Sequence, residues 1–544
     1  MREALKSRSI RRLLAAYLAF VTAEWGTWLA VLIYAFDADG PSAVGLVAMA
    51  QLVPAAIAAP VAPLVIARLG RPSPLALAYG IQALATATTA AAILVAAPSW
   101  LVYTCAAAMT TSIGFGRPAH ATTLVAVADT PAELTAANGA GGTVDGAGIV
   151  IGPAMVGLLF GIVGPGSFLL IVGAGLCGAC LLALSLRVER WEAPITTSTT
   201  RAALLEALRV ATDRRGPLLA TLALAAAWIA MGLLDVLIIV LALGELGGGS
   251  ELVGLLNAAL GVGGMIAGFV AARMVGAGGV LAIGAGLAIA AGGIGVMAVF
   301  HAPIAVAGLL AFVGAGHGLA EIGSRNLLIR LVPVRSVGAV FGLVEGLYAA
   351  SLALGAAFVP PLLTAAPVSA ALAAIALALA VTAAITMPAL VRVSRTIRVP
   401  AAALAVLRRV PLFTPLPVPT IERLARAAQR IEVTRGQVVI QEGRPGDRFY
   451  AIERGTFDVR VGARPIARLG PGDSFGEIAL LRDTPRTASV TAVTDATLIG
   501  VDRDPFLGAV TNHVVAARVA TTVVAARLGH DSERPGRESD SRDL

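Results

Sequence analysis

A run near the end of the chain, residues 471–490, has the residue types that bind a small anion. Gly476 permits a tight turn and close approach of a ligand to the backbone. Residues 477–481 can form one helical turn whose free N–H groups point at a negative group, and Arg486 offers two parallel donors to phosphate oxygens. Glu477 would repel a phosphate, so its presence predicts a ligand that also carries a hydroxyl group.

The order Phe-Gly-Glu-x-Ala-Leu, followed by Pro-Arg-x-Ala-Ser-Val, resembles the phosphate-binding cassette of cyclic nucleotide-binding domains. The resemblance implies that Glu477 binds the ribose 2′-hydroxyl and that Arg486 binds the cyclic phosphate. The alternative is a surface loop with a capping glutamate and a solvated arginine. The expected nucleotide-binding residues are Phe475, Gly476, Glu477, Ile478, Ala479, Leu480, Arg486, Thr487, Ala488 and Ser489.

The resemblance extends beyond this cassette, over residues 400–528, and predicts a β-roll flanked by helices. A helix at residues 421–430 precedes short β-type runs at 431–433, 437–441, 448–452, 457–461, 466–469, 488–493 and 497–501. A C-terminal helix at residues 504–528 would close over the base, with Val514, Val515, Val519, Val523 and Leu528 as contacts. We expect cAMP, the more prevalent of the two nucleotides in bacteria. cGMP stays open, because the Thr487 hydroxyl can also reach the 2-amino group of a syn guanine.

The composition places this domain behind a membrane domain. The chain has 544 residues, of which 57% are hydrophobic and 14% are charged, more apolar than a soluble globular protein needs. Charges are sparse in residues 13–390 and frequent in residues 391–544. The net charge of +8 comes mostly from arginine without a basic stripe of interleaved aromatic residues, so we expect no nucleic-acid binding.

Several chemistries are excluded by the residues present. Cys105, Cys177 and Cys180 all lie in apolar runs, and no histidine or second CxxC accompanies Cys177 and Cys180, so packing is their expected role. The sequence has no catalytic triad, metal-ligand cluster or Walker loop. We therefore expect neither an enzyme, nor a metal cofactor, nor an ATP-driven pump.

A membrane-spanning helix needs about 20 apolar residues. Twelve such runs occur, at residues 13–36, 42–67, 73–97, 99–121, 134–160, 165–186, 217–243, 250–272, 278–300, 302–324, 338–364 and 366–391. Arginine and lysine occur in every second connecting segment and are missing from the others. The positive-inside rule then places both termini in the cytoplasm of a multi-pass protein, which we expect in a bacterial inner membrane.

The two sets of six runs repeat at an offset of about 205 residues, so that Arg68 corresponds to Arg273. Two six-helix halves joined by a long loop resemble the major facilitator superfamily. We expect an all-α membrane domain, residues 1–391, with halves 1–186 and 217–391 around a cytoplasmic loop 187–216 that carries a short helix at residues 200–210. A linker (392–410), the nucleotide-binding domain (411–528) and a disordered tail (529–544) follow.

The superfamily's motif Gly-x-x-x-Asp-Arg-x-Gly-Arg falls on residues 63–71, where Arg68, Gly70 and Arg71 fit but Pro63 and Ala67 do not. The missing aspartate puts the usual gating latch in doubt. The resemblance suggests gate residues at Arg68, Gly70, Arg71, Arg117, Arg273, Glu321 and Arg325. Glu321 and Arg325 are four residues apart and can simply pair.

A second small-residue motif, Gly148-x-x-x-Gly152-Pro153-x-x-x-Gly157, resembles one found in exporters of the superfamily, and its alternative explanation is close helix packing.

Ionisable residues at membrane depth are energetically costly and usually functional. Glu24, Asp145, Asp235 and Glu345 lie within the first, fifth, seventh and eleventh runs, which tend to line the central cavity in this superfamily. They are candidates for proton coupling or cation recognition, and the alternative is that each pairs with an arginine.

Together these patterns predict a secondary transporter that exports a small molecule by proton coupling and is regulated by cytosolic cAMP. A non-transporting membrane receptor and a lipid translocase are the alternatives. No dense charge cluster is visible along the membrane part of the sequence, so the substrate, the direction of transport and the oligomeric state stay open.

Overall fold

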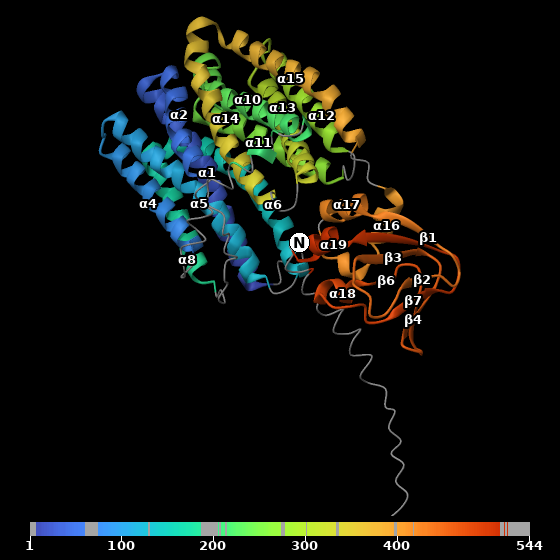
Figure 1. Ribbon diagram of the computed structural model, residues 1–544. Helices are drawn as coiled ribbons and strands as arrows, with labels where there is room; N and C mark the ends of the chain where they lie inside the picture. Colours follow the sequence, from blue (N-terminus) through green and yellow to red (C-terminus); the bar gives the residue numbers. More distant parts are fainter. Residues whose placement is uncertain are drawn as a thin grey trace, which may run out of the picture. The chain divides into compact units, whose positions relative to one another are not determined.

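The computed structural model describes residues 7–59, 74–128, 131–186, 205, 208–210, 212, 215–273, 278–300, 302–332, 337–396, 400–416, 418–511, 516 and 519. The chain divides into two compact units, Met1–Arg395 and Thr396–Leu544 (Figure 1).

The first unit is a bundle of helices, and one lies at each of the apolar runs (Figure 1). The first half contains α1 (Arg8–Asp39), α2 (Pro41–Ala58), α4 (Pro74–Leu94), α5 (Ser99–Val127), α6 (Pro131–Met155), its continuations η2 (Val156–Phe160) and α7 (Gly161–Val163), and α8 (Pro165–Leu184). The second contains α10 (Arg215–Ile239), its continuation η3 (Val240–Glu245), α11 (Ser250–Arg273), α12 (Gly278–Met297), α13 (Pro303–Leu331), α14 (Val337–Ala365) and α15 (Val368–Thr396).

Eleven of these described helices are long and apolar enough to cross a membrane. The exception is α5, which carries Arg117 and His120 together with several threonines. Twelve spans therefore stay a prediction. The predicted run 42–67 is shorter in the structure, because α2 ends at Ala58 and residues 60–73 lie outside the described part. Most of the predicted loop helix at 200–210 also lies outside it.

Glycine and proline set several helix boundaries in this unit. Gly40 ends α1 with a φ of +85° and Pro41 begins α2, while Gly164 has a φ of +78° and Pro165 begins α8. Glycine adopts a positive φ without a steric penalty, and proline suits the first helical turn because its missing N–H has no partner there anyway.

Glycines also set the distance between helices where the halves meet. The halves contact each other where α2 packs on α14 and where α6 packs on α11. A Cβ at Gly45 of α2 would lie 2.7 Å from the Ala356 carbonyl oxygen of α14, and one at Gly254 of α11 would lie 2.5 Å from the Cα of Gly157 in η2, the continuation of α6. These contacts require residues without a side chain at both interfaces.

The small-residue motif of α6 also has a packing role. A Cβ at Gly148 would lie 2.6 Å from Val21 Cγ1, and one at Gly152 would lie 2.8 Å from the Thr22 carbonyl oxygen of α1. With Gly157 against α11, the motif lets α6 approach two helices closely. Close helix packing therefore accounts for this motif in the structure.

The second unit begins with α16 (Ala401–Leu407), η5 (Pro411–Phe413) and α17 (Val418–Ala427) and continues as two four-stranded sheets. The first sheet has the order β1 (Gln429–Val433), β8 (Ala496–Asp502), β3 (Arg448–Arg454) and β6 (Ser474–Phe475). The second has the order β2 (Val438–Ile440), β7 (Ser489–Ala492), β4 (Phe457–Val461) and β5 (Arg464–Leu469). All neighbouring strands are antiparallel.

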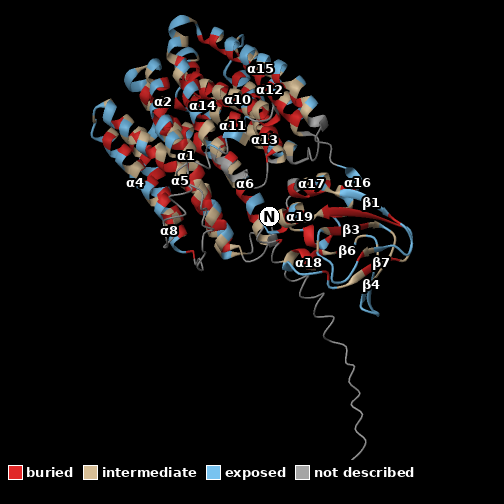
Figure 2. Ribbon diagram, in the orientation of Figure 1, coloured by how far each residue is buried: buried red, intermediate tan, exposed pale blue. Residues whose placement is uncertain are grey.

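Two apolar clusters hold this unit together. Phe413, Phe449 and Phe506 are fully buried, and the rings of Phe449 and Phe506 stack with centroids 4.8 Å apart. They join η5 and α19 (Arg503–Thr511) to β3, which is buried over residues 449–452 (Figure 2). A second cluster around Phe457 and Phe475 fills the space between the sheets.

The described secondary structure differs from the predicted one in two places, and it covers the predicted C-terminal helix only in part. Strand β6 was not predicted, because two residues are too few to give a pattern. The helix predicted at 421–430 ends at Ala427, because Gln429 and Arg430 pair with β8 instead. Of the predicted C-terminal helix, α19 ends at Thr511, and most of the rest lies outside the described residues, as do Val514, Val515, Val523, Leu528 and the tail.

Candidate functional site

The residues of the expected nucleotide-binding cassette are positioned by a sharp turn between β6 and α18 (Glu477–Arg482). Phe475 pairs with Tyr450 of β3, and their rings stack at 5.2 Å, which fixes the end of β6. Gly476 then turns the chain with a φ of +92° and caps α18. A Cβ at this position would lie 2.7 Å from Arg486 Nη1 and 3.0 Å from the Arg448 carbonyl oxygen. Only glycine fits both the conformation and the space.

Arg486 is buried beside this turn, with 4% of its side chain exposed. Its Nη1 donates to the Gly476 carbonyl oxygen at 2.8 Å, and its Nη2 donates to the Arg448 carbonyl oxygen at 2.6 Å and to Asp447 Oδ1 at 3.1 Å. The Asp447 side chain is 80% exposed. An exposed carboxylate is a partner that a phosphate can replace without leaving a buried charge behind.

The other cassette residues surround the same turn. Glu477, Ala479 and Leu480 are buried on α18, and Ile478 is half-buried. Thr487 is exposed next to Arg486, Ala488 is half-buried, and Ser489 accepts a hydrogen bond from the Glu442 backbone N–H at 3.0 Å. Burial and the nearby Asp447 carboxylate raise the pKa of Tyr450, so its phenol stays protonated there. The fold thus gathers all ten predicted residues around one exposed loop.

In the membrane unit, the structure assembles a first charge cluster from three helices. Arg117 of α5 forms ion pairs of 2.9 Å with both Glu24 of α1 and Asp145 of α6. The Tyr17 hydroxyl donates to Asp145 at 2.9 Å. Two candidates for proton coupling and one for gating therefore form one site.

A second charge cluster lies in the other half. Arg325 of α13 donates to Glu321 at 3.0 Å, as their spacing predicts, and to Glu345 of α14 at 2.7 Å. His317 Nε2 lies 3.8 Å from Glu321 Oε2. The Arg325 guanidinium lies 5.6 Å from the ring centre of Trp228 on α10, a cation–π distance.

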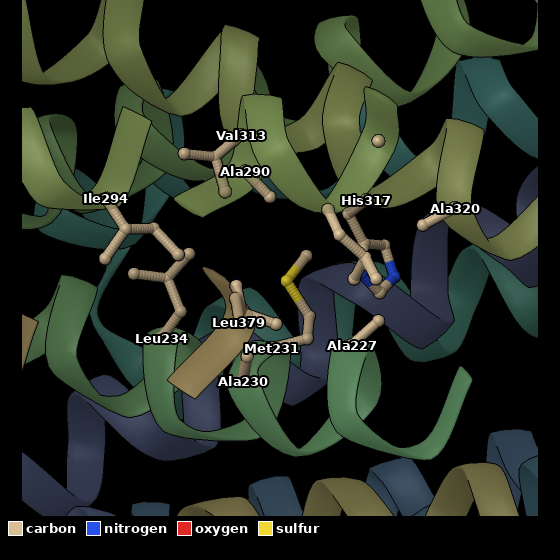
Figure 3. A pocket seen from close by; sticks show the side chains of 12 residues that line it. Ala227, Ala230, Met231, Leu234, Ala290, Ile294, Val313, His317, Ala320 and Leu379 are labelled. Atoms are coloured by element: carbon tan, nitrogen blue, oxygen red, sulfur yellow. The ribbon is translucent and has the colours of Figure 1, made fainter. Parts of the chain in front are cut away.

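Asp235 of α10 stands apart from these pairs: it is 8% exposed and has no hydrogen-bond or ion-pair partner among the described residues. A small apolar pocket opens between α10, α12, α13 and α15, and His317 and Met231 are among its lining residues (Figure 3). Its other lining residues are apolar, so the pocket offers shape rather than charge.

The remaining candidates are not placed. Arg68, Gly70 and Arg71 lie outside the described residues, and so does the side chain of Arg273. The described residues contain no group of three metal ligands. The thiol of Cys180 donates to the Ala76 carbonyl oxygen at 3.2 Å, in keeping with a packing role.

Sequence reasoning missed four neighbours of these sites: Tyr17, Trp228, Tyr348 and Asp447. Asp447 directly precedes a predicted strand. Nothing in that pattern indicates that its carboxylate contacts Arg486, which is 39 residues away in the sequence. Tyr17, Trp228 and Tyr348 lie within apolar runs, where no pattern in the sequence distinguishes them from residues that only pack.

Comparison with known proteins agrees with both units. The family model "Cyclic nucleotide-binding domain" matches residues 430–513. A solved structure described as "cAMP bound PfPKA-R (141-441)" is 22% identical over 24% of this chain and 45% of that chain, with a TM-score of 0.23, which is too low to support an argument. The family model "Major Facilitator Superfamily" matches residues 13–356, well over half of the chain. The chain therefore belongs to the major facilitator superfamily, and it carries a cyclic nucleotide-binding domain behind its membrane helices.

Proposed function

We propose that this protein is a secondary transporter whose activity is set by a cyclic nucleotide, with cAMP as the ligand. The observation that carries the proposal is the presence of both family matches in one chain, together with a buried arginine at the turn of the nucleotide cassette. An appended ligand-binding domain regulates a transporter only if the ligand binds the transport states unequally.

For the nucleotide, we propose that Arg486 binds the cyclic phosphate in place of the Asp447 carboxylate. The backbone N–H groups at the start of α18 would complete the phosphate site, and the Glu477 carboxylate would accept a hydrogen bond from the ribose hydroxyl. Thr487 is exposed beside Arg486, where its hydroxyl can contact ligand. This contact also admits cGMP, so the choice of base is a matter for measurement.

For the membrane unit, we propose a multi-pass arrangement in the cell membrane with both termini in the cytoplasm, following the alternation of arginines. That orientation puts the nucleotide site in the compartment where cyclic nucleotides are made. The domain limits 1–391, 411–528 and the linker between them belong to the same proposal. A small molecule and the lipid bilayer are the proposed partners.

For transport, we propose proton-coupled efflux. The carboxylates that take up and release the coupled protons as cargo moves are Glu24, Asp145, Asp235 and Glu345. The arginines Arg117 and Arg325 hold three of these carboxylates by ion pairs, and a pair that breaks and reforms is suited to alternating access. Arg68, Gly70, Arg71, Arg273 and Glu321 remain proposed gate residues.

The test is flux in proteoliposomes, measured with and without cAMP. We expect cAMP to change the wild-type rate, Arg486→Ala to abolish that change, and Arg482→Ala, an exposed arginine of the same loop region, to leave it intact. Transport that ignores cAMP in the wild type would refute the regulatory role. A non-transporting receptor is the second candidate, favoured by Ala67 in place of the gate aspartate. It predicts nucleotide binding without any flux.

A further inference from the structure

The two charge clusters of the membrane unit belong to one site between the halves. Trp28, one helical turn after Glu24 on α1, and Tyr348, one turn after Glu345 on α14, pack on the same apolar cluster between the halves. The Tyr348 ring also packs edge-on against Trp228, which lies beneath the Arg325 guanidinium. Charged side chains at membrane depth face the interior of the bundle or a water-filled cavity, so both clusters face the space between the halves.

This site carries an excess of negative charge. Four carboxylates, on Glu24, Asp145, Glu321 and Glu345, share the two guanidinium groups of Arg117 and Arg325. Asp235 adds a fifth carboxylate that is more than nine-tenths buried, has no partner among the described residues, and lies seven residues after Trp228 on the same face of α10. A buried unpaired carboxylate is unfavourable unless a cation or proton neutralises it.

Aromatic rings complete the site. Trp228 is fully buried, and its Nε1–H has no hydrogen-bond partner among the described residues. One face carries the Arg325 guanidinium, and Tyr348 packs edge-on at 5.1 Å. The Arg325 guanidinium, held between an aromatic face and two carboxylates, occupies this site as an organic cation would.

An anionic ligand fits this arrangement poorly. Each arginine already holds two carboxylates, so an anion would have to displace one of them and leave it unpaired, which is unfavourable. A cation instead supplies the positive charge that the site lacks. It can reach the carboxylates, because the side chain of Glu345 is 47% exposed and that of Arg117 is 39% exposed.

We infer that this site binds an organic cation of the ammonium, phosphonium or guanidinium class, which takes Glu345 and Glu24 from their arginines while Asp235 and Trp228 provide the buried charge and the aromatic face. The inference rests on the proposed transport function and names the substrate class of that same site.

The test uses the full chain, purified in detergent, and radiolabelled tetraphenylphosphonium as the probe. We expect saturable binding that weakens about tenfold or more in Glu345→Gln and in Glu24→Gln, whereas Glu245→Gln, an exposed carboxylate at the end of η3, leaves it unchanged. Arg325→Gln should bind the cation more tightly, because it removes the internal competitor. Misfolding cannot produce this gain.

Equal affinity in the wild type and both glutamate variants would overturn the inference. So would weaker binding by Arg325→Gln, or preferential binding of the isosteric anion tetraphenylborate. Flux is measured separately on the same preparations. A cation that binds but is never moved supports the site and counts against the transport function, whereas flux of a neutral or anionic cargo without cation binding does the reverse.

Discussion

Gly476→Ala tests whether the turn at the start of α18 controls the nucleotide arginine. The substitution has two separable consequences. Alanine must adopt a φ of +92°, in the left-handed region, which costs about 1–2 kcal/mol. Its Cβ must also lie 2.7 Å from Arg486 Nη1, which is closer than van der Waals contact allows, so the guanidinium has to move.

The second consequence determines the effect on binding. Moving the buried guanidinium also breaks its hydrogen bonds to the Gly476 and Arg448 carbonyl oxygens, which adds to the loss of stability. A displaced guanidinium loses one charge-assisted hydrogen bond to phosphate, worth about 1.5–3 kcal/mol. We therefore expect the cAMP affinity of Gly476→Ala to fall by about ten- to hundredfold, with the domain destabilised by at least about 1–2 kcal/mol.

Two neighbouring glycines separate these terms. Gly472 also has a positive φ, of +93°, but a Cβ there meets no atom within 4 Å, so Gly472→Ala carries the strain alone. Gly470 has neither feature and serves as the unperturbed control. Calorimetric titration with cAMP and thermal unfolding of the full chain should show Gly472→Ala destabilised with unchanged affinity. If Gly476→Ala binds cAMP as tightly as Gly472→Ala does, the turn does not position Arg486 for the ligand.

Three further substitutions test the fold and its electrostatics. Phe506→Ala should destabilise the second unit by about 3–5 kcal/mol in chemical denaturation, because this fully buried ring packs two helices on the sheet. Gly254→Val should abolish monodisperse protein on size exclusion, since even a Cβ would lie 2.5 Å from the α6 backbone, whereas Gly264→Val, with open space, should be tolerated. Hydrogen bonding from Arg468 lowers the pKa of Asp458, so Arg468→Gln should return that pKa toward 3.8 in an NMR titration. Because the folded pKa is the lower one, the wild type's advantage in stability exists above the unfolded pKa and disappears as the pH falls through the folded pKa.

That the expected cassette residues lie together could be predicted from the sequence, because they are nearly contiguous. Gly476, Glu477 and Arg486 lie on one turn and its following loop, so spacing alone brings them together. The Asp447 contact to Arg486 could not be predicted, because it depends on how β3 is placed beside β6 in the sheet. Strand β6 itself is defined by that pairing and not by any pattern of its own residues.

In the membrane unit, local pairs were predictable and distant ones were not. Glu321 and Arg325 are four residues apart on one helix, which places them on one face. Arg117 meets Glu24 and Asp145 from 93 and 28 residues away, and apolar runs indicate only that each residue lies in a helix, not toward which neighbour it turns. The sequence therefore predicted four membrane carboxylates as separate candidates, whereas the fold combines three of them, Glu24, Asp145 and Glu345, into charge clusters around two arginines and leaves Asp235 apart.

The proposed regulation of a cation site in one unit by a nucleotide site in the other has a thermodynamic consequence that holds whatever path connects the two sites. If cAMP changes the affinity for the cation by some factor, the cation must change the affinity for cAMP by the same factor. We expect a factor of about 5–150, the usual range for such coupling. It can be measured on the purified chain as two dissociation constants: that of tetraphenylphosphonium with and without saturating cAMP, and that of cAMP with and without saturating tetraphenylphosphonium.

Arg486→Ala should prevent cAMP binding, so cAMP should no longer change the affinity for the cation. Glu345→Gln should prevent cation binding, so the cation should no longer change the affinity for cAMP. Both shifts must also have the same sign, since an activating nucleotide that stabilises the cation-binding state is itself bound more tightly when cation is present. If neither dissociation constant changes when the second ligand is added to the wild type, the nucleotide does not act on cargo affinity. Its influence would then have to lie in the rate of interconversion between transport states, where this reciprocity does not apply.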